Sequence, residues 1–399
     1  MTLSPSSVSI YYAKRTPIGS FLKSFANVSS IDLTTNLIKD LYKIHPFLRD
    51  SNIDQVILGQ VLTCGLGQNP ARQVVIKSNI PNTTTATLVN QVCGSGLKAV
   101  ILAAQAIQLG QAANIIAGGQ ENMSRANHYF YARQGVKYDS LEVKDSLLED
   151  GLKDVFNRVA MSETAQYLAL KYKISREEQD LFALESHKKS AIATQNKHFD
   201  AEICPVILEQ YDNMVISMDE GIRYDTNLEK LSRLKPIVKS LNPAIEASVT
   251  AGNSSTINDG SSVLALASNK YLEAHNIEPM AKIISYAEIG LEPMSMGLGP
   301  IEAIRAALKL ANWNIKEVDL FEINEAFAAQ AIICARELNL DKSKLNVSGG
   351  AISLGHPIGA SGARILTTLL YNLIRLNKSK GIASLCIGGG MGIAICIQR

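Results

Sequence analysis

Two stretches far apart in the chain share one local pattern, and this repeat limits the fold more than any other feature. Residues 93–98 read Cys-Gly-Ser-Gly-Leu-Lys, and residues 359–364 read Gly-Ala-Ser-Gly-Ala-Arg. Each stretch opens a helical pattern, and each helix is followed by an apolar strand that ends in a glycine pair, at 118–119 and 388–389. This pattern indicates an internal duplication. Two similar halves would bring the starts of these helices near a common axis, where one site can use both.

Strand-like and helical segments alternate at both ends of the chain. In the N-terminal part we predict strands at 8–13, 55–61, 87–92 and 114–117 and helices at 31–42 and 96–109. In the C-terminal part we predict strands at 281–287, 320–323, 382–386 and 392–397 and helices at 300–310, 326–338 and 361–376. This alternation predicts an α/β fold with helical layers around a largely buried sheet.

The middle of the chain has a different character. Residues 125–255 are more polar and charged, and a capping-box pattern at 175–178 starts a helix that continues to about residue 196. We predict three parts. The N-terminal core half is 1–124, completed by about 256–279, the loop or lid domain is 125–255, and the C-terminal core half is 280–399. The alternative for the middle part is a third domain without a role in binding. We favour a lid, because insertions on α/β cores often supply ligand contacts.

Bulk properties exclude several classes of protein. The net charge is +2 and no block of lysine and arginine is present, which argues against a nucleic-acid partner. No apolar run is long enough to span a membrane. The first residues lack the pattern of a secretory signal and the last ones lack a peroxisomal signal, so we expect a cytoplasmic protein. The six cysteines show neither CxxC nor Cys/His ligand spacing, so no metal site is expected.

Cys93 is the strongest candidate for a nucleophile. It directly precedes a predicted helix, and the helix dipole is expected to lower the pKa of its thiol and favour the thiolate. The neighbouring glycines allow a substrate carbonyl to approach the backbone, whose N–H groups can bind an oxyanion. The alternative is a small apolar residue in a tight contact between helix and sheet. From this motif alone the two readings carry equal weight.

Three further residues fit the same chemistry, each with a structural alternative. His356 lies in a glycine-rich loop that suits a positioned base, or it only satisfies local hydrogen bonds. Cys386 ends an apolar strand before a glycine turn and can act as acid or base on a substrate carbon, or it is a buried strand residue. Asn324, at a strand-to-helix junction, can hold a water beside a reacting carbonyl, or it caps the helix.

Together, these motifs resemble one family from end to end. They are Arg-Thr-Pro-Ile-Gly at 15–19, the segment 90–96, Gly-Gly-Gln-Glu-Asn-Met-Ser at 118–124, Thr-Ala-Gly-Asn-Ser-Ser at 250–255, Asn-Glu-Ala-Phe at 324–327, and the segments 355–362 and 386–392. The chain resembles the thiolases, specifically the acetyl-CoA acetyltransferases among them. The resemblance implies two similar βαβαβαββ halves in a five-layered α/β/α/β/α core, with a loop domain over the coenzyme A site. It also implies acetyl-CoA, acetoacetyl-CoA and CoA as ligands, no other cofactor, and a homotetramer or homodimer.

The resemblance assigns roles to the candidate residues. Cys93 is expected to be the acylated nucleophile and His356 the base that activates it. Cys386 is expected to remove the α-proton of the second acyl-CoA, or to return it in the reverse direction. Asn324 is expected to fix a water for one oxyanion hole, with His356 as the other donor. The backbone N–H groups of Cys93 and Gly388 would form the second oxyanion hole.

The resemblance also implies contacts with coenzyme A. The residues concerned are Met161, Arg223, Ala251, Ser255, Ala326 and Phe327. Arg223 is expected to face the nucleotide or its phosphate, where a guanidinium is well suited. Two departures from the family pattern affect this pocket. Ala160 precedes Met161 where short-chain members usually carry histidine, which weakens the case for strict two-carbon specificity. The stretch 239–246 is several residues longer than in the common short-chain pattern.

Competing functions stay open at this point. The first is an acetyl-CoA C-acetyltransferase that makes or splits acetoacetyl-CoA. The second, in the same family, is a degradative 3-ketoacyl-CoA thiolase with longer substrates. A cysteine hydrolase using Cys93, His356 and Asn324 is a different class, but hydrolysis has no use for a second thiol such as Cys386. A non-catalytic thiolase-like binder is the last alternative, and the presence of all four reactive groups argues against it.

Overall fold

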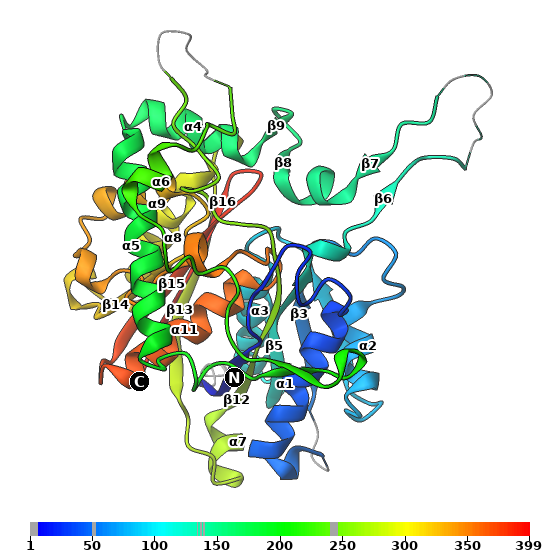
Figure 1. Ribbon diagram of the computed structural model, residues 1–399. Coiled ribbons are helices and arrows are strands. Elements are labelled where there is room, and N and C mark those ends of the chain that lie inside the picture. The colour runs from blue at the N-terminus through cyan, green and yellow to red at the C-terminus, as the bar shows by residue number, and fades with distance from the viewer. Residues whose placement is uncertain (1–6, 50–52, 134, 136–137, 139, 240–245) are drawn as a thin grey trace.

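A single large sheet organises the molecule. The computed structural model describes residues 7–49, 53–133, 135, 138, 140–239 and 246–399 (Figure 1). Within these residues the large sheet has ten strands, in the order β14-β15-β16-β13-β1-β12-β5-β3-β4, with β2 paired to β12. Its N-terminal strands are β1 (Val8–Arg15), β2 (Gly19–Ser20), β3 (Gln55–Gly59), β4 (Thr85–Val89), β5 (Asn114–Asn122) and β12 (Asn258–Ser268). Its C-terminal strands are β13 (Ala281–Gly290), β14 (Leu320–Ile323), β15 (Lys380–Ile387) and β16 (Met391–Gln398).

The two parts of the sheet have the same strand order. The series β1-β12-β5-β3 corresponds to β13-β16-β15-β14, and in each series two antiparallel pairs are followed by one parallel pair. A short parallel bridge between Phe321 and Leu345 stands where the N-terminal part has β4. The parts meet between β1 and β13, through the pairs Ser9 with Lys282 and Ile10 with Ala281. The prediction of two similar halves is confirmed.

Helices cover both faces of each part, which produces five layers. Helices α3 (Ser95–Gln108) and α11 (Ser361–Arg375) lie between the two parts of the sheet and share one apolar core with both. Helices α1 (Ser30–Ile44) and α2 (Pro70–Lys77) cover the outer face of the N-terminal part. Helices α8 (Gly299–Ala311) and α9 (Ala328–Glu337) cover the outer face of the C-terminal part. Among the helices that the structure describes, none has the length and apolar character needed to cross a membrane.

The two central helices meet at their first turns because both carry glycine there. A Cβ atom on Gly96 would lie 2.9 Å from the carbonyl oxygen of Gly359, and one on Gly362 would lie 2.4 Å from the backbone nitrogen of Leu97. Real Cβ atoms do not approach other atoms so closely. The paired glycines noted in the sequence therefore allow the start of α3, with Cys93 directly before it, to contact the loop that carries His356.

The segment between β5 and β12 lies outside the large sheet. Its helices are α4 (Met161–Lys171), α5 (Arg176–Gln195) and α6 (Leu228–Ser232), with a one-turn helix at Leu147–Leu152. Its short strands are β6 (His128–Tyr129), β7 (Lys144–Asp145), β8 (Lys153–Asp154), β9 (Val159–Ala160), β10 (Val206–Leu208) and β11 (Met214–Ile216). Figure 1 shows β6 and β7 on an arm that extends away from the body. The capping box predicted for α5 forms between Ser175 and Glu178. The division into three domains stays a prediction.

Buried ion pairs attach part of this segment to the core. Arg15, at the end of β1, is fully buried and bonds Glu202 at 2.6 Å and Asp219 at 2.7 Å. Glu202 also accepts a hydrogen bond from Thr368 of α11 at 3.0 Å. A buried ion pair is costly to break, because removing one partner leaves an uncompensated charge. These contacts therefore hold residues 202–219 in a fixed place against β1 and α11.

The structure shifts several predicted boundaries. The strand predicted at 87–92 is observed at Thr85–Val89, because residues 90–94 form the tight turn that presents Cys93. The strand predicted at 114–117 continues to Asn122, since β12 pairs with all of it. The helix predicted at 326–338 begins at Ala328, because Phe327 bridges to Ser254 instead.

Candidate active site

One cavity brings together most of the residues predicted for the site. Its volume is about 290 Å³, and its wall is formed by segments from both halves and from the middle of the chain. The predicted residues that line it are Cys93, Met161, Ser255, Ala326, Phe327, His356, Cys386 and Gly388. Most of the remaining lining is apolar and includes Met123, Leu148, Leu152, Ile237, Ile257, Met296 and Ile358. An apolar cleft with a few convergent polar groups is the usual form of a small-molecule site.

Cys93 is presented by a strained turn. Val92, directly before it, has φ +47°, a left-handed conformation that is rare for a β-branched residue. The side chain of Asn90 holds this turn by accepting the Val92 N–H at 2.9 Å. Ser95 Oγ donates to the Val92 carbonyl at 2.6 Å and accepts the Gln91 N–H at 2.8 Å. The backbone therefore bends sharply, and the Cys93 side chain projects into the cavity from the start of α3.

The protonation state expected for Cys93 is wrong. Cys93 faces the cavity and is only partly buried as a residue, but its sulfur is enclosed by protein atoms. This burial raises the pKa of its thiol to about 11, instead of lowering it as expected for a helix start. The backbone N–H groups of Gly388 and of Cys93 itself act on this pKa in the opposite direction, with a smaller effect. The resting residue is a thiol that needs a base when it reacts.

His356 is fixed at its backbone and at one ring nitrogen. Its backbone N–H donates to Asn258 Oδ1 at 3.0 Å. Its ring Nδ1 lies 2.5 Å from Ser361 Oγ, and Ser361 Oγ donates its own proton to the Pro357 carbonyl at 2.9 Å. Because that hydroxyl proton is already used, Ser361 accepts from Nδ1–H. The contacts assign the tautomer with hydrogen on Nδ1, which leaves Nε2 as the free basic nitrogen.

Burial keeps this imidazole neutral. The pKa of His356 is lowered to about 3. Burial is the main cause, and the positive charge of Arg364 adds to it. At neutral pH the cavity therefore holds a Cys93 thiol and a neutral His356 imidazole.

A direct test of this state is the ultraviolet absorbance of thiolate. We expect wild-type protein and the Cys93→Ala variant to absorb equally at neutral and mildly alkaline pH, since burial raises the pKa of the Cys93 thiol to about 11. N-acetylcysteine at high pH, where its thiol is fully ionised, shows how large the signal of one thiolate is. A thiolate signal that depends on Cys93 and is complete at neutral pH would contradict a thiol–imidazole pair.

Asn324 contacts the histidine and does not cap a helix. The N-cap of α9 is Phe327, so the capping alternative for Asn324 is wrong. Asn324 Nδ2 lies 3.5 Å from His356 Nε2, and Asn324 Oδ1 accepts a hydrogen bond from Arg364 Nη2 at 3.4 Å. The guanidinium thus orients the amide, with its NH₂ group toward the ring nitrogen that is free to react.

Cys386 is the last residue but one of β15, just before the chain turns into β16. The turn needs glycine, because Gly389 and Gly390 have φ +86° and +84°, and a Cβ on Gly390 would lie 2.2 Å from the Leu291 carbonyl oxygen. Cys386 is buried beside Met296 and Ala326. Burial, and then the proximity of Cys93, raises the pKa of the Cys386 thiol well above its ordinary value. Both sulfurs therefore sit in one enclosed, weakly polar space.

Glu121 holds the two halves together at the site, although no role was predicted for it from the sequence. Its carboxylate accepts N–H groups from Val61 at 3.0 Å, Leu62 at 3.2 Å and Gly359 at 3.0 Å. Burial raises the pKa of this carboxyl to about 7. The only signal was its place in the motif 118–124. Asn258, Ser361 and Arg364 were missed in the same way, because their partners are distant in sequence or depend on the turn geometry.

Two of the residues predicted to contact coenzyme A lie outside this cavity. Arg223 and Ala251 are exposed and do not line the cavity, although the backbone N–H of Arg223 donates to His187 Nδ1 at 3.1 Å. Ala160 does line the cavity, next to Met161. The stretch 239–246, predicted to alter the pocket, includes residues 240–245, which lie outside the described residues. In the described part of the chain, no group of three or more His, Cys, Asp and Glu side chains is arranged to hold a metal ion.

Comparisons with known proteins match the whole chain. The family model for the thiolase N-terminal domain matches residues 8–270, and the model for the thiolase C-terminal domain matches residues 277–399. An acetyl-CoA acetyltransferase of Chromobacterium violaceum is 46% identical, over 98% of this chain and 99% of its own length. A cytosolic acetyl-CoA acetyltransferase of Rattus norvegicus is 44% identical, over 98% of both chains.

Solved structures agree with these matches. The crystal structure of the Bacillus anthracis acetyl-CoA acetyltransferase superimposes with a TM-score of 0.95 and 39% identity over 100% of both chains. The crystal structure of human mitochondrial 3-ketoacyl-CoA thiolase superimposes with a TM-score of 0.94 and 37% identity over 99% of both chains. The fold, the family models and the full-length relatives give one answer: this chain belongs to the thiolase family and is an acyltransferase.

Proposed function

We propose that the chain is an acetyl-CoA C-acetyltransferase, which condenses two molecules of acetyl-CoA to acetoacetyl-CoA and CoA and also catalyses the reverse thiolysis. The observation that carries this proposal is the meeting of two cysteines and one neutral histidine in a single apolar cavity. Acyl transfer to one sulfur divides the reaction into two easier steps. The second sulfur supplies the proton transfer on carbon that a condensation needs and a hydrolysis does not.

In the first step Cys93 becomes acetylated. His356 Nε2 takes the thiol proton as the sulfur attacks the thioester carbonyl of acetyl-CoA. The C–S bond to coenzyme A then breaks, and the leaving thiolate takes the proton from the imidazolium. The products are acetyl-Cys93, free CoA and a neutral histidine. The tautomer with a free Nε2 supports this role, as does the raised pKa of the thiol, which makes a base necessary.

In the second step a carbon–carbon bond forms. The proton of Cys386 passes to His356, and the resulting thiolate removes an α-proton from a second acetyl-CoA. The carbanion attacks the acetyl carbonyl, the bond to Cys93 breaks, and the Cys93 thiolate takes the proton from the imidazolium. All protons are thereby returned, and the product is acetoacetyl-CoA.

Two groups of donors would stabilise the oxyanions. The backbone N–H groups of Gly388 and Cys93 lower the pKa of the Cys93 thiol against the effect of burial, and we propose that they bind the oxygen of an acyl group carried there. Asn324, by way of a water, and His356 Nε2 would bind the oxyanion of the second thioester. Met161, Ser255, Ala326 and Phe327 would contact the coenzyme A arm. Arg223 and Ala251 stay proposals for its nucleotide end.

A second candidate is a 3-ketoacyl-CoA thiolase that acts on longer acyl chains. The small side chain of Ala160 in the cavity wall supports it, as does the likeness to the human 3-ketoacyl-CoA thiolase structure. A cysteine hydrolase or a non-catalytic binder would leave Cys386 without a purpose. We also propose a cytoplasmic location, in line with the cytosolic acetyl-CoA acetyltransferase of Rattus norvegicus, and a homotetramer or homodimer.

Rates across acyl lengths test the proposal. We expect kcat/KM for thiolysis to be higher with acetoacetyl-CoA than with 3-ketoacyl-CoA substrates of increasing length, and we expect free CoA to be required. A higher kcat/KM on the longer chains would select the second candidate. Hydrolysis of acetyl-CoA without acetyl transfer would select the hydrolase, and absence of any turnover would select the binder. Native mass measured on the same sample gives the number of subunits.

A further inference from the structure

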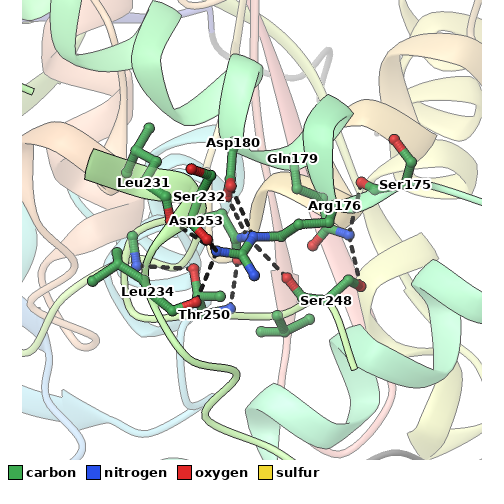
Figure 2. A network of polar contacts seen from close by, with 12 residues as sticks. Ser175, Arg176, Gln179, Asp180, Leu231, Ser232, Leu234, Ser248, Thr250 and Asn253 are labelled. Atoms are coloured by element: carbon green, nitrogen blue, oxygen red, sulfur yellow. Dashed lines mark hydrogen bonds and ion pairs between the residues drawn. The ribbon is translucent and has the colours of Figure 1, made fainter. Parts of the chain in front are cut away.

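A network of polar contacts joins the first turn of α5 to a loop that is distant in sequence (Figure 2). Arg176, the first residue of α5, donates from Nε to Asp180 Oδ2 at 2.7 Å. The other carboxylate oxygen of Asp180 accepts Asn253 Nδ2 at 2.9 Å. Asp180 and Asn253 are buried, with 3% and 0% of their surface exposed. The three side chains thus form a continuous chain of charge-assisted hydrogen bonds, which are stronger than neutral ones.

At one end, the guanidinium fixes the end of α6 and the chain beyond it. Arg176 Nη2 donates to the carbonyl oxygens of Leu231 at 2.8 Å and Leu234 at 2.9 Å, and more weakly to that of Ser232 at 3.4 Å. The last carbonyl groups of a helix have no partner within the helix, and a cation is favoured there. Figure 2 shows the Arg176 side chain reaching these carbonyl groups from α5.

At the other end, Asn253 shapes the loop in which it lies. Its Oδ1 accepts the Thr250 N–H at 2.8 Å, and its Nδ2 donates to the Ser248 carbonyl at 3.0 Å. Gln179, on the same helix as Asp180, adds a bond from Nε2 to Ser248 Oγ at 2.9 Å. The two held segments also contact each other, because the Ile237 N–H donates to the Val249 carbonyl at 3.0 Å.

These two segments form one wall of the active-site cavity. Ser254, Ser255 and Thr256 line it directly after Asn253, and Ile237 lines it a few residues after Leu234. Ser254 pairs with Phe327, which packs beside the buried Cys386, so this end of the wall is near the reacting sulfurs. Ile237 is 50% exposed, so the other end is near the opening. Arg176, Asp180 and Asn253 themselves do not line the cavity.

We propose that Arg176, Asp180 and Asn253 are positioning residues. They hold this wall of the cavity in the place where it contacts the part of the coenzyme A arm beyond the thioester. They therefore determine the KM for coenzyme A thioesters and not the rate of the chemical step. The inference rests on the proposed function. It follows because the network is separate from the contacts that hold the reacting residues. Cys93 is held through Ser95, and His356 is held through Ser361. Loosening residues 231–237 would change the outer wall and leave those contacts in place.

The test compares two substrates of different length in thiolysis. Acetoacetyl-CoA extends along the whole wall, whereas the acetoacetyl thioester of N-acetylcysteamine keeps the reacting group and lacks the nucleotide and most of the pantetheine. For Arg176→Gln we expect KM for acetoacetyl-CoA to rise about tenfold with little change in kcat, since bonds from a charged donor are lost. With the short thioester, kcat/KM is expected to change less than about twofold. Arg176→Lys and Asp180→Asn are expected to fall between wild type and Arg176→Gln.

The matched control is Arg336→Gln. Arg336, on α9, forms an ion pair with Glu178, which lies on α5 together with Arg176. This ion pair is exposed and does not reach the cavity wall. We expect this variant to keep the wild-type KM for both substrates. If Arg176→Gln instead lowers kcat/KM for both thioesters by the same factor, or changes only the melting temperature, the proposal is overturned. If Arg176→Gln does not fold, the same criterion is applied to Arg176→Lys. Failure of the proposed function is separate, because wild-type protein would then turn over neither substrate.

Discussion

The Cys93→Ala variant is expected to form no acyl-enzyme and to lose turnover by at least about 10⁴-fold, as expected when a covalent nucleophile is removed. Among the described cysteines in the cavity, Cys93 is the one presented by the strained turn at Val92, directly before α3. Alanine keeps the turn and the helix start, because Ser95 and Asn90 hold the backbone through main-chain contacts at Val92. The loss is therefore chemical rather than structural.

Intact-protein mass spectrometry after mixing with acetyl-CoA measures the acyl-enzyme. Wild-type protein is expected to gain one acetyl group, and Cys93→Ala none. The control is Cys64→Ala, which removes an exposed thiol outside the cavity and should keep both the acyl-enzyme and the turnover of wild type. An acetyl group that still appears on Cys93→Ala, and that peptide mapping places on Cys386, would show that the two sulfurs have the opposite roles.

The Cys386→Ala variant is expected to separate the two steps. Acetylation of Cys93 should proceed as in wild type, because Cys386 has no part in attack on the first thioester. The carbon–carbon step should slow by about 10²–10⁴-fold, the usual contribution of a positioned acid or base. Rapid mixing with acetyl-CoA should then show release of one equivalent of CoA per active site, followed by almost no acetoacetyl-CoA.

A buried thiol outside the cavity provides the comparison for this variant. Cys396, on the adjacent strand β16, is fully buried and does not line the cavity, so Cys396→Ala should keep both steps. Condensation at the wild-type rate by Cys386→Ala would mean that another group moves the α-proton, and His356 would be the remaining candidate in the cavity. Loss of the CoA burst as well would mean that Cys386 is needed for acylation, which the proposed division of roles does not allow.

Local sequence patterns predicted the elements that carry the site. The helix that follows Cys93, the strand that ends at Cys386 and the capped start of α5 at Ser175 all appear close to their predicted places. Each depends on residues within a few positions of one another: glycines at a turn, a serine and glutamate in a capping box, or a short apolar run. Such patterns can be read without knowing the fold.

Other features came from contacts that no local pattern contains. The carboxylate of Glu121 reaches Gly359, 238 positions away, and Asn258 reaches the backbone of His356, 98 positions away. Arg176 contacts carbonyl groups 55 to 58 positions further along the chain. The turn at Val92 was included in the strand predicted at 87–92. Residues 87–89 do belong to β4, but nothing in the residue types signals the positive φ of Val92.

The pKa expected for Cys93 and the contact expected for Asn324 differed from the structure for the same reason. From the sequence alone, the helix start after Cys93 favours a lowered pKa, but the folded chain encloses the sulfur and raises the pKa to about 11. Likewise, Asn324 stands where a helix cap is expected, yet Phe327 pairs with Ser254 and moves the start of α9, leaving the Asn324 amide to contact His356.

The sequence by itself determined the class of fold and the repeated halves, and it selected the candidates for the reactive groups, because these follow from short-range periodicity and from residue types at turns. The tertiary structure alone decided the protonation states and the tautomer of His356. It also decided which carboxylates and guanidinium groups hold the loops, and which residues form the cavity wall. These properties depend on burial and on distances between segments far apart in the chain, and both exist only once the two halves and the middle segment have packed together.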